Sequence, residues 1–161
     1  MKALAWTLLV GLAAGCGEDA DVAGTYSVSV TNRDNACMFT NWTAGETAAN
    51  IPVVITQRGS DVTLTINGVA GVLLVGLLGA DGNVYAGGVD STNIDVESFG
   101  TRSQTSGNCT FTYNSRISGE LDGDALSGRI EYRAADNGNP DCAAISGCLT
   151  YQDFNGTRPP T

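Results

Sequence analysis

In residues 109–134, CTFTYNSRISGELDGDALSGRIEYRA, the side chains alternate between apolar and polar on both sides of a turn. Asp122-Gly123-Asp124 separates the two arms, and Asp-Gly is a strong hairpin-turn signal. Apolar residues fall on odd positions before the turn and on even positions after it: Phe111, Tyr113, Ile117 and Leu121, then Leu126, Ile130 and Tyr132. This period of two predicts a β-hairpin with one face on a core and one in water.

The two arms also predict their own register. If Leu121 pairs with Leu126, then three further pairs fall on the same face: Gly119 with Gly128, Ile117 with Ile130, and Ser115 with Tyr132. A slip of one residue would move every apolar side chain of one arm into water, so the pattern favours this register.

Similar alternation recurs along the chain. Residues 24–31 form a first predicted strand, and residues 53–66 form a hairpin in which Gln57 pairs with Val62, Ile55 with Leu64 and Val53 with Ile66. Pro52 is expected at the start of a strand, where its missing N–H costs least. Further strands are predicted at 84–89, 94–99 and 147–154, and Gly87-Gly88 predicts a bulge or a close backbone approach.

Residues 69–80, VAGVLLVGLLGA, are apolar without alternation. The run is too short for a membrane helix, which needs about 20 residues. We expect a strand covered on both faces. The alternative is an exposed apolar patch that contacts a partner or lipid.

The fold class that follows is all-β, with about eight antiparallel strands in an up-and-down meander and no helix. Closing such a meander into a barrel removes its exposed edges. A β-sandwich is the alternative that local patterning leaves open.

The N-terminus has the features of a signal peptide. Lys2 precedes the apolar run ALAWTLLVGL at residues 3–12, and small residues then lead to Cys16. The run Ala13-Ala14-Gly15-Cys16 resembles the lipobox of bacterial lipoproteins, although Ala13 stands where that family usually has Leu. An ordinary secretory signal with an incidental cysteine is the alternative.

The lipoprotein resemblance implies cleavage before Cys16, with diacylglycerol on its thiol and an acyl chain on its amine. Gly17 after the cysteine implies the outer membrane, with the protein facing the periplasm or the cell surface. The expected organisation is then a signal peptide at 1–15, a lipidated cysteine and tether at 16–23, one barrel domain at 24–158 and a tail at 159–161. Several acyl chains anchor a protein durably where one binds only marginally.

The charge of the chain argues against nucleic acid as a partner. Its only lysine is Lys2, and it contains no histidine. Beyond the signal, seven arginines against 17 acidic residues give a formal charge of −10. Such a surface repels phosphate backbones and anionic headgroups.

The two ends of the domain resemble the lipocalin-like (calycin) barrels. Gly24-Thr25-Tyr26 stands where that group has Gly-x-Trp, and Arg158 matches an arginine that packs over the ring in the family. The resemblance covers only these ends. It implies a barrel, a small apolar ligand and no catalysis.

Four cysteines follow Cys16: Cys37, Cys109, Cys142 and Cys148. An even number in an exported chain predicts two disulfides. Of the three pairings, we expect Cys142 with Cys148 across a short loop and Cys37 with Cys109. Zinc is the alternative, but no C-x₂-C pair or histidine supports it.

Catalytic and metal chemistry find little support in the sequence. Ser-His and Cys-His mechanisms are excluded, because they require histidine as the base. Glu120, Asp122 and Asp124 form the densest carboxylate group, which suits a solvated turn better than a hydrolase. Residues 136–141, DNGNPD, offer oxygen atoms but not the EF-hand spacing, which argues against calcium as a cofactor. We therefore expect no enzyme, metal or cofactor beyond the acyl groups on Cys16.

Phe39 and Trp42 lie in a long polar segment, residues 31–50, and are the candidate ligand-binding residues. Packing over a barrel mouth would also explain them. The leading hypothesis is a non-catalytic binding module for a small apolar ligand or an envelope protein. The alternatives are a structural or interaction lipoprotein with a filled barrel and, second, a carboxylate-dependent hydrolase.

Overall fold

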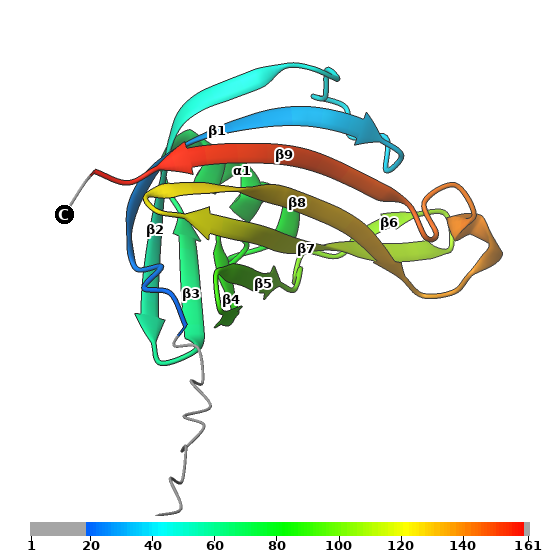
Figure 1. Ribbon diagram of the computed structural model, residues 1–161. Coiled ribbons are helices and arrows are strands. Elements are labelled where there is room, and N and C mark those ends of the chain that lie inside the picture. The colour runs from blue at the N-terminus through cyan, green and yellow to red at the C-terminus, as the bar shows by residue number, and fades with distance from the viewer. Residues whose placement is uncertain (1–18, 160–161) are drawn as a thin grey trace, which may run out of the picture.

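The chain forms a closed antiparallel barrel of eight strands with one short α-helix, in a computed structural model that describes residues 19–159 (Figure 1). The described residues form nine strands, of which all but the short β6 belong to the barrel: β1 (Gly24–Asn35), β2 (Thr47–Arg58), β3 (Asp61–Ile66), β4 (Val84–Asp90), β5 (Asn93–Ser98), β6 (Gln104–Ser106), β7 (Cys109–Asp122), β8 (Ala125–Asp136) and β9 (Leu149–Thr157). The helix is α1 (Gly68–Leu78), and a 3₁₀ turn, η1, covers Pro140–Cys142. The lipocalin-like barrel expected from the sequence is confirmed as a fold.

Two pairings close the barrel. β1 to β5 pair in chain order, and so do β6 to β9; in addition β9 pairs with β1, and β5 pairs with β7. The short β6 adds only three residues to the far end of β7, outside the ring of eight. β1, β7, β8 and β9 are long and arch side by side beyond the shorter β3, β4 and β5 (Figure 1). At one end of the barrel, the wall formed by β1, β7, β8 and β9 therefore projects beyond the wall formed by the shorter strands.

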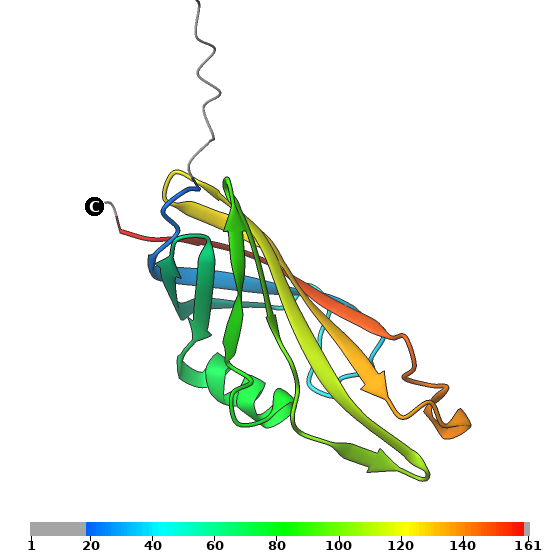
Figure 2. The same ribbon diagram turned by 90° about the horizontal axis from the view of Figure 1, so that it is seen from below.

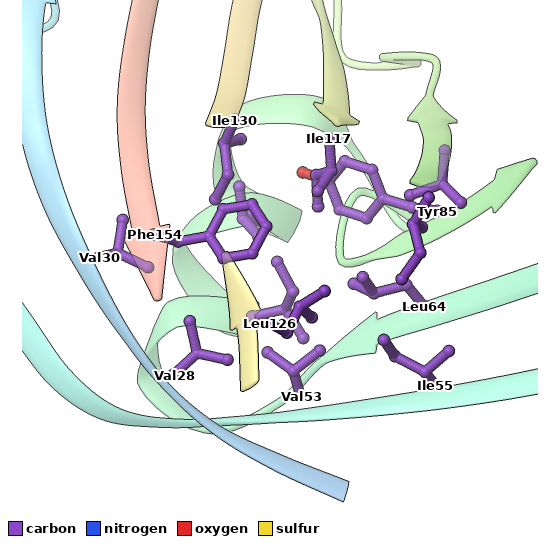
Figure 3. Packing of buried hydrophobic residues seen from close by; sticks show 14 of the residues in the cluster. Val28, Val30, Val53, Ile55, Leu64, Tyr85, Ile117, Leu126, Ile130 and Phe154 are labelled. Carbon is purple, nitrogen blue, oxygen red and sulfur yellow. The ribbon is translucent and has the colours of Figure 1, made fainter. Parts of the chain in front are cut away.

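Both predicted hairpin registers are confirmed. In β7 and β8, Leu121 lies opposite Leu126, Ile117 opposite Ile130 and Ser115 opposite Tyr132. In β2 and β3, Ile55 lies opposite Leu64 and Val53 opposite Ile66. The apolar members of these pairs are buried. Figure 3 shows several of them, such as Ile117, Ile130 and Leu64, converging in the barrel interior with residues from β1, β4 and β9.

The strand predicted at 69–80 is wrong, because Gly68–Leu78 forms α1. Gly71, Leu74 and Leu78 are buried, and their spacing of three and four residues defines one helix face. Gly71 allows the close approach, since a Cβ there would come within 2.3 Å of the Ile66 carbonyl oxygen. The opposite face is open to solvent, which agrees with the alternative of an exposed apolar patch.

The expected disulfide pairing is also wrong. Cys37 is bonded to Cys148, and Cys109 is bonded to Cys142. The first bond joins the end of β1 to the start of β9, which are neighbours in the barrel. The second joins the start of β7 to η1. Both bonds therefore fasten the projecting end of the sheet, and the local 142–148 loop closes through backbone hydrogen bonds instead.

Pro52 and Gly87, two residues with special backbone properties, both lie within strands. Pro52 lies inside β2 opposite Ser27, not at a strand start, and β1 carries a register shift just beyond, between Val28 and Val30. Gly87 is a close backbone approach, because a Cβ would come within 2.1 Å of the Asp95 carbonyl oxygen. The register around it is continuous, so there is no bulge.

Candidate functional site

The barrel interior holds a pocket of about 460 Å³. Its floor is made of inward-facing strand residues, and one side is covered by α1. Its lining residues are Val28, Val30, Asn32, Phe39, Thr40, Asn41, Trp42, Glu46, Ala48, Ile51, Val53, Leu64, Ile66, Ala70, Leu73, Leu74, Leu77, Ile117, Leu126, Ile130, Tyr132, Gln152 and Phe154. Most of them are aliphatic or aromatic, as is typical of sites for small apolar molecules.

The period of two explains why the pocket wall is apolar. Val28 and Val30 of β1, Ile117 of β7 and Ile130 of β8 alternate with outward polar residues and point into the interior (Figure 3). Phe154 of β9 reaches the same space. Small residues help to shape it, since Cβ atoms at Gly119 and Gly128 would come within 3.0 Å and 2.9 Å of Phe154 Cζ.

The mouth carries both aromatic residues predicted from the sequence. Asn35 holds their loop, because its side chain accepts from the Phe39 N–H and donates to the Phe39 carbonyl, each at 2.8 Å. Trp42 Nε1 donates to the Arg33 carbonyl at 2.8 Å. The Phe39 ring lies 5.8 Å from both the Trp42 and the Tyr132 rings, measured between centroids. Phe39 and Trp42 thus pack over the mouth and also line the pocket.

A chain of polar groups crosses one wall of the pocket. Tyr132 Oη donates to Gln152 Oε1 at 3.0 Å, and Gln152 Nε2 donates to Asn32 Oδ1 at 2.7 Å. Burial raises the pKa of Tyr132 well above its usual value, and the nearby Tyr85 adds to this, so the phenol stays neutral and keeps its proton. The wall therefore offers neutral hydrogen-bonding groups next to an apolar surface.

The exposed face of α1 lies beside this pocket. Val69, Val72 and Leu73 are 78 %, 71 % and 66 % exposed. Arg102, which donates to the Gly76 carbonyl, holds the C-terminal end of the helix. Because Leu73 also lines the pocket, the apolar patch continues into the pocket mouth.

The opposite end of the barrel is closed by the first described residues. Val22 is fully buried; its N–H donates to Gln57 Oε1 and its carbonyl accepts from Tyr26 Oη. The Arg158 guanidinium lies 5.9 Å from the Tyr26 ring centroid and donates to the Ala23 carbonyl. The lipocalin-like resemblance implied this ring–arginine contact. Figure 2 shows the start of the described chain and α1 at opposite ends of the barrel.

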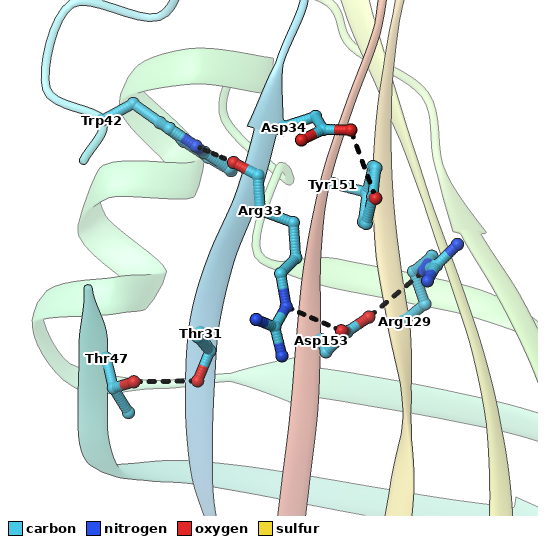
Figure 4. A network of polar contacts seen from close by, with 8 residues as sticks. All are labelled: Thr31, Arg33, Asp34, Trp42, Thr47, Arg129, Tyr151 and Asp153. Carbon is cyan, nitrogen blue, oxygen red and sulfur yellow. Dashed lines mark hydrogen bonds and ion pairs between the residues drawn. The ribbon is translucent and has the colours of Figure 1, made fainter. Parts of the chain in front are cut away.

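The outer face near the mouth carries a separate polar network (Figure 4). Asp153 accepts from Arg33 at 2.8 Å and from Arg129 at 3.2 Å. Burial opposes ionisation of Asp153, but these hydrogen bonds outweigh it and lower its pKa. Arg129 also lies 4.2 Å from the Tyr151 ring centroid. The network directs both guanidinium groups away from the pocket.

The other predicted sites lie elsewhere. Glu120, Asp122 and Asp124 remain at the β7–β8 turn, far along the barrel from Trp42, and Asp124 pairs with Arg158 at 2.8 Å. In the 136–141 loop, Asp136 accepts from the Gly138 N–H, and Asp141 accepts from the Asn108 N–H and side-chain amide. Within residues 19–159 no three His, Cys, Asp or Glu side chains form a metal-binding group. Cys16 lies outside the described residues.

Sequence reasoning missed several lining residues. Asn32 follows the inward apolar positions Val28 and Val30 of β1, and Gln152 lies between the buried Thr150 and Phe154 of β9, so a polar side chain at an inward position was the available signal. Ala70, Leu74 and Leu77 were missed because their segment was expected to be a strand. Nothing in the sequence marks Glu46 as a residue of the mouth.

Comparisons with known proteins give no relative: no family model, curated protein or solved structure matches this chain. Of the helical segments in the described part, none has the length and apolar character that crossing a membrane requires.

The buried tyrosines predict how stability depends on pH. Burial raises the pKa of Tyr26, Tyr85, Tyr113 and Tyr132, that of Tyr85 to about 12. The folded state therefore holds these protons more tightly than the unfolded state, whose phenols titrate near 10. This stability is fully present below about pH 10 and is lost as pH rises toward 12.

Urea melts across pH should show this loss. Without lysine or histidine after Lys2, few other side chains titrate between about pH 6 and 9, so the free energy of unfolding should be flat there. It should fall steeply above about pH 10. A fall that begins near neutral pH would contradict the assignment to tyrosine.

Proposed function

We propose that this protein is a lipid-anchored, non-catalytic binding protein of a bacterial outer membrane whose barrel takes a small apolar ligand. The observation that carries the proposal is the pocket of about 460 Å³ with mainly aliphatic and aromatic walls. This size lies within the range of about 300–1,000 Å³ typical of small-molecule sites. A filled barrel would leave no such space, which favours the binding module over the purely structural alternative.

Filling the pocket tests this function. Ala70 lines the pocket from α1 and is only partly buried, so Ala70→Phe adds a ring to the cavity without removing core packing. We expect the wild type to bind the neutral fluorophore N-phenyl-1-naphthylamine saturably with one site. The variant should bind at least about tenfold more weakly.

Ala86→Phe is the matched control. Ala86 is exposed on β4 and does not line the pocket, so this variant should bind like the wild type. Equal binding by all three proteins, or no saturable binding by the wild type, would refute the ligand pocket.

Anchoring is supported by the lipobox-like run that ends at Cys16. It also agrees with the position of Cys16 in the sequence, shortly before the described residues that close one end of the barrel. Asp19 lies three residues after Cys16, a reach of about 10 Å in an extended chain. Its carboxylate accepts from the Ser91 N–H at the closed end. A lipid on Cys16 would therefore hold the closed end near the membrane and leave the mouth facing away.

Cys16→Ser tests the anchor. The variant should lose incorporation of labelled fatty acid and should leave the membrane fraction after a carbonate wash, because no acyl chain remains. Thr56→Ala is the control, since it changes an exposed residue of β2, leaves all cysteines in place and should stay lipidated. Retention of the Cys16→Ser protein in washed membranes would show that the anchor is wrong.

A protein partner is the second candidate function. The exposed faces of Val69, Val72 and Leu73 favour it, because contiguous apolar side chains on a surface often mark contacts. Val72→Asp should abolish such a contact and leave binding of the naphthylamine in the pocket unchanged.

A further inference from the structure

We propose that the pocket selects ligands whose polar group is neutral or positively charged and excludes carboxylates. The inference rests on the proposed function and adds the chemical class of the ligand. It follows from which charges line the pocket, where the arginines lie, and which hydrogen-bonding groups the wall offers.

The pocket lining carries almost no charge. Of its lining residues, only Glu46 and Tyr132 can ionise, and Tyr132 stays neutral. Glu46 stands at the mouth, where its carbonyl accepts from the Asn32 N–H at 2.9 Å. No arginine lines the pocket, and the chain after Lys2 contains no lysine or histidine.

Two arginines on strands of the pocket wall, Arg33 and Arg129, are held on its outer face. Asn32 lines the pocket, so Arg33, the next residue of β1, points outward and pairs with Asp153. Arg129 on β8 also pairs with Asp153 on that face (Figure 4). A carboxylate entering the pocket would thus lose its water without gaining a cationic partner, which is strongly unfavourable.

The polar part of the pocket wall can form hydrogen bonds with a neutral polar group of a ligand. Tyr132, Gln152 and Asn32 form one hydrogen-bonded chain, in which Asn32 acts as an acceptor. An amide also carries two N–H donors and a carbonyl with two lone pairs, so this wall can serve a hydroxyl, a carbonyl or an amine. A cationic group would gain the attraction of the Glu46 carboxylate as well.

Tryptophan fluorescence provides a direct assay. In a chain without residues 1–15 and with Cys16→Ser, Trp42 is the only tryptophan, and it lines the pocket. Decanol, decylamine and decanoate share one alkyl chain and differ in the charge of the head group at neutral pH. We expect decanol and decylamine to bind at least about tenfold more tightly than decanoate.

Variants of Glu46 separate the local effect from overall charge. Glu46→Gln should weaken decylamine by about tenfold and leave decanol unchanged, and Glu46→Arg should bring decanoate to at least the affinity of decanol. Glu120→Gln is the control: it removes the same charge from an exposed residue outside the pocket and should change none of the three affinities.

The outcomes distinguish this inference from the proposed function. If none of the three compounds binds, the proposed function fails. If decanoate binds as tightly as decanol, the pocket is a ligand site but the inference is overturned. The inference also fails if Glu46→Gln and Glu120→Gln weaken decylamine equally, because overall charge would then explain the preference.

Discussion

Removing the Cys37–Cys148 disulfide should cost this domain about 5 kcal/mol of stability. The bond spans 111 residues, and in the chain-entropy model the stabilisation grows with the size of the closed loop. The Cys109–Cys142 bond spans 33 residues and should be worth about 4 kcal/mol. Since small domains are stable by only about 5–15 kcal/mol, the first loss alone removes about a third or more of that stability.

Urea melts of the two double alanine variants, made with Cys16→Ser to avoid exchange, would measure both costs. Peptide mapping of the unreduced protein gives the connectivity independently. It should release a fragment that links Cys37 to Cys148, and a Cys142–Cys148 fragment would contradict the fold at its projecting end.

The second large effect is expected in the closed part of the core. Ile55 on β2 is 2 % exposed and does not line the pocket, so Ile55→Ala leaves a cavity that the ligand space cannot absorb. It should cost about 2–5 kcal/mol. Thr56, the next residue, is exposed on the outer face, and Thr56→Ala should cost within about 0.5 kcal/mol. Similar losses of unfolding free energy for both variants would contradict the inward–outward alternation of β2.

The alternation explains how much of the fold was predictable from the sequence. A side-chain period of two fixes which face is buried, so the pairs Ile117–Ile130 and Ile55–Leu64 followed from local pattern alone. A helix was not predictable at 68–78, because a segment that is apolar on every face shows no hydrophobic periodicity from which helix or strand could be inferred. The helix packs through Gly71 against Ile66 of β3, a contact between segments that the local pattern does not reveal.

The disulfides and the pocket were predictable only in part. The even cysteine count indicates two bonds, but connectivity depends on which strand ends become neighbours. Cys37 and Cys148 are brought together by the β1–β9 pairing, which joins the first and last strands of the barrel. Phe39 and Trp42 were identifiable as aromatics in a long polar segment. Asn32, Gln152 and Glu46 join them only because β1, β9 and the start of β2 meet at the mouth.

The position of a bound ligand shows whether the barrel interior is a binding site. Decanol can be titrated into protein with ¹³C-labelled methyl groups and followed by NMR. Occupation of the pocket predicts saturable shifts of the Ile117, Leu126 and Ile130 methyl resonances, which line the interior, and little change at Ile55. Shifts confined to Val69, Val72 and Leu73, rising without saturation, would show adsorption to the outer face of α1 and would contradict a ligand site inside the barrel.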